Sequence, residues 1–133
     1  MGDRCYLEVV IQKKDNPIWL SVLRTPGLEA YFDSVDINDQ KPGALTCVSQ
    51  EANYALYSEL EAAANQGAKF YGSHGAGGDY GPCRFIAHRR KVLYADETTD
   101  GRLMVEVDET GAPVKQDLAR MARFCKLYAK AQS

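Results

Sequence analysis

The residues best equipped for chemistry gather in one glycine-rich segment, residues 71–82. It holds five of the chain's eleven glycines, and glycine lets a backbone approach a ligand closely and adopt positive φ. Successive backbone N–H groups in such a segment can form a nest that binds an anion. Hydroxyl, imidazole, carboxylate, phenol and guanidinium groups surround this backbone, so we predict a ligand- or partner-binding site here. Its residues are Ser73, His74, Gly75, Gly77, Gly78, Asp79, Tyr80 and Arg84.

The pattern of this segment excludes two familiar phosphate-binding motifs. A Walker loop requires a lysine and a serine or threonine after its last glycine, and none follows here. A dinucleotide fingerprint opens a helix, whereas we expect a strand after this segment. The alternative to a site is a tight connection between two strands.

An enzyme is the alternative to a binding protein. In this hypothesis a small hydrolase or transferase acts on a phosphorylated metabolite, with His74 as general base and Asp79 orienting its ring. Backbone amides of the segment would hold the developing negative charge. Because residue order assembles no Ser-His-Asp or Cys-His set, we favour a non-enzymatic protein. Its partner would be another protein or a small anionic, nucleotide-like ligand.

A second candidate site is the basic run His88, Arg89, Arg90 and Lys91, which can contact phosphates. A solvated hairpin turn is the interpretation we favour. The whole chain has 16 basic and 18 acidic residues and a net charge of -2, without the basic excess typical of nucleic-acid binders. The composition therefore disfavours nucleic acid as a partner.

The four cysteines, Cys5, Cys47, Cys83 and Cys125, lie far apart without a Cys-x-x-Cys pair, so no metal site or cofactor is expected. No apolar run is long enough to cross a bilayer. Charged residues interrupt the apolar stretch of residues 1–14, which is unlike a signal peptide. We therefore expect a cytoplasmic protein that binds no membrane, with reduced cysteines and with all but Cys83 on buried faces.

Positioning these residues requires a sheet. Apolar and polar residues alternate over residues 4–13 and 102–108, which predicts strands with one buried face. Shorter β-prone runs predict further strands, at residues 45–48, 69–71, 83–88 and 92–95. The length and composition fit a single domain over residues 1–133. The fold class is α+β, a mixed, mostly antiparallel sheet with about three helices packed on one face.

Three helices are predicted. The first begins at Asn16 and Pro17, and the second covers residues 50–66 after Ser49 as its cap. Near the start of the second helix, Tyr54 and Tyr57 would line a pocket beside the glycine-rich segment. The third covers residues 114–129. Its inward face is expected to be Leu118, Met121, Ala122, Cys125 and Tyr128, and its outward side chains Lys115, Asp117, Arg120, Arg123 and Lys126.

Three stretches, residues 1–6, residues 51–54 with 58–60, and residues 72–81, resemble small uncharacterised proteins encoded by phages and prophages. The likeness covers about half of the chain. It implies an accessory factor in a bacterial cytoplasm that interferes with host machinery or defence, so that the protein partner would be a host protein. These families have no settled catalytic residues to carry over.

Overall fold

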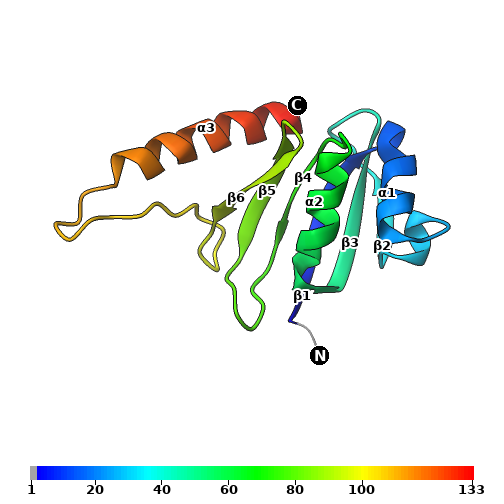
Figure 1. The fold of residues 1–133 in the computed structure, drawn as a ribbon, viewed down its shortest axis with the longest axis horizontal. Coiled ribbons are helices and arrows are strands. Elements are labelled where there is room, and N and C mark those ends of the chain that lie inside the picture. The colour runs from blue at the N-terminus through cyan, green and yellow to red at the C-terminus, as the bar shows by residue number, and fades with distance from the viewer. Residues whose placement is uncertain (1–2) are drawn as a thin grey trace.

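A computed structural model describes residues 3–133 and confirms the α+β fold. Its centre is a six-stranded sheet in the order β2-β3-β1-β4-β5-β6, in which every pairing is antiparallel (Figure 1). The strands are β1 (Arg4–Gln12), β2 (Ser34–Ile37), β3 (Ala44–Asn53), β4 (Phe70–His74), β5 (Cys83–His88) and β6 (Lys91–Asp96). The α-helices are α1 (Asn16–Leu23), α2 (Tyr57–Asn65) and α3 (Lys115–Gln132). None of the described helices is both long and apolar enough to cross a bilayer.

The helices cover both faces of the sheet, so the prediction of one covered face was wrong (Figure 1). Leu7 and Val9 of β1 belong to the core under α1 and α2. Val10, which points the other way, belongs to a second core under α3 with Tyr71 and Ile86. Because this second face is also apolar, it needs a helix to cover it.

The core under α1 and α2 is the deeper of the two. Trp19 of α1 and Leu60 of α2 are fully buried and pack against the sheet. The rings of Trp19 and Phe70 meet edge to face with centroids 5.1 Å apart. The predicted start of α1 is confirmed, since Pro17 lies in its first turn, where a missing N–H costs nothing.

The prediction of a helix over residues 50–66 was half wrong. The strand expected to end at residue 48 continues to Asn53, and α2 begins only at Tyr57. Ser49, expected as a cap, pairs with Leu7 across the β1–β3 ladder. The long β1 strand satisfies the backbone groups of this segment, and this pairing outweighs the local capping signal.

Residues 102–108 do not form the predicted strand. They make only two isolated bridges, Glu97–Leu103 and Val107–Pro113, and lead outward to the start of α3. The alternation has another cause, because Leu103 and Val105 pack into the core under α3 while Met104 is exposed. In turn, β2 lies in a stretch where no strand was predicted.

The buried face of α3 is rotated from the predicted one. Met121 is buried as expected, but its main companion is Phe124, while Leu118 is 49% exposed. Ala122 and Cys125 are also exposed, whereas the half-buried Tyr128 lies on the inner face. The first half of α3, which includes Leu118, extends beyond β6 (Figure 1). All four cysteines are unpaired, and Cys83, not Cys125, is the third buried thiol.

Candidate functional site

The glycine-rich segment forms a loop, residues 75–82, between the antiparallel neighbours β4 and β5. Several of its N–H groups are already used inside the protein. The amide of Gly75 donates to the Tyr6 carbonyl at 2.8 Å, and that of Gly77 to the Tyr80 carbonyl at 2.9 Å. The amide of Asp79 donates to the Asp3 carboxylate at 3.0 Å. Three of the loop's N–H groups are therefore committed to partners inside the protein.

Two glycines of this loop, Gly77 and Gly78, allow close packing. No glycine of the loop has positive φ. A Cβ on Gly77 would lie 2.4 Å from the Tyr80 ring, and one on Gly78 would lie 2.7 Å from the Asp3 carboxylate. These contacts explain Gly77 and Gly78 without a ligand, whereas a Cβ on Gly75 or Gly81 would meet no atom closer than 3.9 Å.

The sheet separates the predicted site residues. Ser73 and Arg84 pair across β4 and β5 and therefore share the face covered by α3. The guanidinium of Arg84 bonds to Glu97 at 2.8 Å and lies 5.8 Å from the centre of the Tyr128 ring. His74 points to the opposite face. No single surface brings the eight predicted residues together.

His74 lies in a packed aromatic cluster and is only 3% exposed. Its Nδ1–H donates to the Gly75 carbonyl at 2.8 Å, and its Nε2 accepts from the Tyr57 hydroxyl at 3.1 Å. This tautomer follows because a carbonyl oxygen can only accept. The Tyr80 ring approaches edge to face, with centroids 5.4 Å apart. Burial lowers the pKa of His74 and raises the pKa of Tyr57 to about 12.

This geometry fits a structural role for His74. Both ring nitrogens have protein partners, so Asp79 does not orient the ring as the enzyme hypothesis requires. Tyr57, predicted to line a pocket beside the glycine-rich segment, lies next to it and bonds to His74 inside the packed aromatic cluster. Tyr54 points elsewhere and is exposed.

A strained turn that the sequence did not reveal positions Tyr57. Tyr54, Ala55 and Leu56 have φ values of 51°, 52° and 54°, three left-handed residues in succession without a glycine. Such conformations persist only where the surroundings enforce them. Here Ala55 and Leu56 are buried, and α2 starts directly after them.

The α3 face holds a cavity of about 360 Å³ that no sequence pattern indicated. It lies where β1, β4 and β5 meet the last turn of α3. Val10, Tyr71 and Ile86 contribute apolar lining. Four lysines also line it, and they come from four separate parts of the chain: Lys14, Lys41, Lys69 and Lys130. We call this cavity the lysine pocket.

The charged side chains that line the lysine pocket are all positive. It takes four of the chain's eight lysines, and no carboxylate lines it. Lys41 Nζ donates to the Ala131 carbonyl at the end of α3. Lys14, Lys69 and Lys130 are exposed, and among residues 3–133 they form no ion pair. The buried Asp15 carboxylate accepts the backbone N–H of Lys69 at 2.9 Å, which fixes the start of β4.

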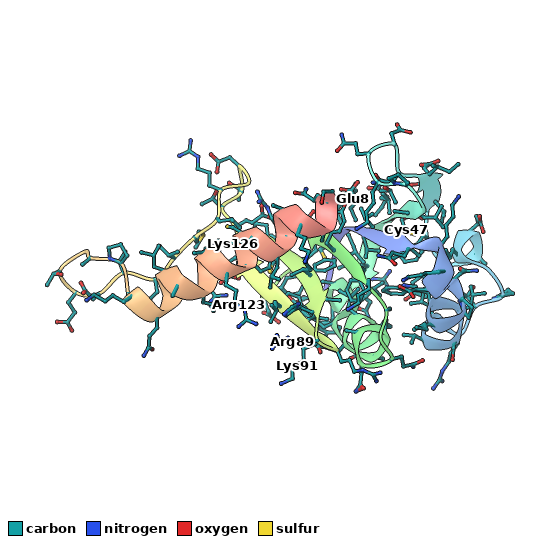
Figure 2. All side chains as sticks on the ribbon, turned by 90° about the horizontal axis from the view of Figure 1, so that it is seen from above. Glu8, Cys47, Arg89, Lys91, Arg123 and Lys126 are labelled. Carbon is teal, nitrogen blue, oxygen red and sulfur yellow. The ribbon has the colours of Figure 1, made fainter. Side chains whose placement is uncertain are left out.

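A second cavity, of about 640 Å³, lies between α3 and the β5–β6 turn. We call it the basic groove, because Arg89, Lys91, Arg120 and Arg123 line it and no carboxylate does. Figure 2 shows Arg89, Lys91 and Arg123 on one side of α3. Burial, and then the positive charges of Arg89, Arg123, Lys69 and Lys130, lower the pKa of His88.

The basic run predicted at residues 88–91 is therefore divided. His88, Arg89 and Lys91 line the basic groove, whereas Arg90 turns away and donates to the Asn65 carbonyl at 3.1 Å.

Within the described residues, no group of three His, Cys, Asp or Glu side chains is placed to hold a metal ion.

Comparison with family models, curated proteins and solved structures finds no match to this chain.

Proposed function

We propose that this protein is a non-enzymatic binding protein for a small amphipathic anion of the nucleotide type, and that the lysine pocket is its site. The observation that carries the proposal is the convergence of four lysines from separate segments on an apolar cavity without a carboxylate. In the glycine-rich loop, our first candidate from the sequence, close packing accounts for Gly77 and Gly78.

The energetics favour an anionic occupant. Like charges that face one cavity repel each other, and a bound anion converts this repulsion into attraction. Lysine binds phosphate as a point charge with three donors. The apolar lining suits a ring or hydrocarbon portion, and the volume of about 360 Å³ lies within the range of small-molecule sites.

The residues around the pocket fit a protein that binds its ligand without catalysing a reaction. The titratable side chains that line it are lysines and Tyr71, and burial raises the pKa of Tyr71. His74, the general base of the enzyme hypothesis, lies on the opposite face of the sheet with both nitrogens bonded. The resemblance to phage and prophage proteins extends the proposal: the bound anion would be a host metabolite withheld from host machinery.

Calorimetric titration with adenosine triphosphate, and with inorganic phosphate as the simpler probe, tests this function. Lys14→Gln, Lys69→Gln and Lys130→Gln should each weaken binding of the nucleotide by about tenfold, since a charge-assisted hydrogen bond contributes about 1.5–3 kcal/mol. Ala131→Trp should also weaken it by filling the pocket.

Lys13→Gln and Lys126→Gln are matched controls, because these lysines do not line the pocket. They should bind the nucleotide like the unchanged protein. No binding of the nucleotide, or equal losses in the control variants, would contradict the proposal. Losses confined to Ser73→Ala and Arg84→Gln would move the site to β4 and β5 beside the glycine-rich loop.

A further inference from the structure

The segment between β6 and α3, residues 97–114, forms a projection that we call the arm. It runs away from the sheet and returns into the first turn of α3 (Figure 1). The hydrogen bonds of its outer end are made within the arm and to the first turn of α3. The Val114 amide donates to the Glu106 carbonyl at 2.9 Å, and the Glu106 amide donates to the Asp117 carboxylate at 2.7 Å. The outer arm is therefore fixed to α3 and lies beyond the sheet.

The arm and the start of α3 expose apolar side chains. Met104 is 46% exposed, Val107 55% and Leu118 49%, and together they are three of the seven large exposed hydrophobic residues of the described chain. All three lie on the arm or on the first turn of α3 that it joins, which makes this projection a candidate contact surface.

The charge of the arm is opposite to that of the basic groove. The arm carries five carboxylates and one arginine, Arg102. Three of the carboxylates, Glu106, Asp108 and Glu109, lie at its outer end. Hydrogen bonds from the Thr110 side chain and from backbone amides, first that of Ala112, hold the pKa of Asp108 below its usual value, so it stays ionised.

The basic groove matches this projection. Leu93 and Phe124 contribute apolar lining, and Arg89, Lys91 and Arg123 form no ion pair within the described residues. The outer arm of the same chain is fixed to the first turn of α3 by the hydrogen bonds of Glu106 and Val114. Asp117 of that turn pairs with Arg120 of the groove, so the arm lies beside its own groove and does not line it. A second copy carries the complementary projection and is free to approach.

We propose that two copies of this chain form a two-fold dimer in which the acidic arm of each docks in the basic groove of the other. Such an interface is self-complementary, as two-fold symmetry requires. Met104, Val107 and Leu118 would supply its apolar contact, and the opposite charges would set its register. The inference is independent of the proposed function, because the arm does not line the lysine pocket.

Sedimentation velocity over a range of protein concentrations tests the dimer. Glu106→Lys with Glu109→Lys in the arm, or Arg89→Glu with Arg123→Glu in the groove, should each raise the dimer dissociation constant by at least about tenfold. The variant that combines all four changes should recover much of the association, because the charges are exchanged. Val107→Ser with Leu118→Ser should also weaken it.

The matched control is Ile37→Ser, since Ile37 is 69% exposed at the other edge of the sheet. It should leave the dimer unchanged. A chain that is monomeric at every concentration would overturn the inference, as would a dimer that Ile37→Ser disrupts or that the arm variants leave intact. Lys14→Gln and Lys69→Gln should dimerise normally, so failure of the anion site and failure of the dimer are separate results.

Discussion

The two faces of the sheet differ in depth and in charge. Under α1 and α2, large side chains such as Trp19, Leu60 and Phe85 are fully buried in a continuous core. Under α3 the core is thinner, with Met121 and Phe124 as the buried residues of the helix. The lysine pocket and the basic groove flank this thinner core.

Because of this difference, stability and the proposed binding would depend on different faces of the sheet. A deep apolar core contributes most of the free energy of folding, and substitutions of its side chains strongly lower the free energy of unfolding. The exposed lysines and arginines of the α3 face can change with little effect on folding. A binding site on that face is therefore free to vary while the other face holds the fold.

Truncating one core residue on each face gives the largest expected effects. Trp19→Ala should lower the free energy of unfolding by about 3–5 kcal/mol, and Met121→Ala by about 2 kcal/mol, because fewer atoms pack around Met121. Chemical denaturation measures both, with the exposed Ile37→Ala as a control within about 0.5 kcal/mol. An equal or larger loss from Met121→Ala would mean that the α3 face is the main core.

Gly72→Ala tests how tightly the deep face is packed. An added Cβ would lie 2.1 Å from the Glu8 carbonyl oxygen and 2.8 Å from the Phe85 ring. We expect a loss of about 1–3 kcal/mol in the free energy of unfolding. Gly81→Ala is the matched change in the loop, where a Cβ meets nothing within 4 Å, and it should be nearly neutral. Similar losses from both variants would show that the clash at Gly72 is relieved.

His74 should make the stability of the deep face depend on pH. Its folded pKa is lowered by burial, so the unfolded chain, with a histidine pKa of about 6.5, binds the proton more readily. This contribution is therefore complete above about pH 6.5 and is lost as the pH falls below that value. Denaturation curves from pH 8 to pH 5 should show a smaller decline for His74→Gln than for the unchanged protein.

His88 is the control for this titration, because it lies on the α3 face and is only half-buried. Solvent and salt screen its neighbouring charges, so His88→Gln should keep most of the decline. If His74→Gln keeps the full decline instead, the buried imidazole is not its source.

Local patterns predicted those parts of the fold in which local and tertiary preferences agree. The alternation of Leu7, Val9 and Ile11 predicted β1, and the short runs at β5 and β6 were also predicted correctly. The start of α2 was missed because Ser49 and Ala52 pair with β1, a contact far away in the sequence. Leu118 was misplaced because its burial depends on where the sheet ends.

The candidate site was beyond the reach of sequence patterns for a similar reason. Lys14 and Lys130 lie at opposite ends of the chain and meet only because α3 packs back over β1 and β4. The glycine-rich segment attracted attention because its signal is local. In the structure, Gly77 packs closely against the Tyr80 ring and Gly78 against the Asp3 carboxylate.

Nuclear magnetic resonance of the ¹⁵N-labelled protein, titrated with adenosine triphosphate, tests most directly that the α3 face is the binding face. The account predicts that the largest amide shift changes fall at residues 10–14, 69–71, 86–88 and 130–131, which line or adjoin the lysine pocket. Amides of residues 75–82 should change little. Largest changes in residues 75–82, with the lysine pocket unaffected, would contradict the account and place binding at the glycine-rich loop.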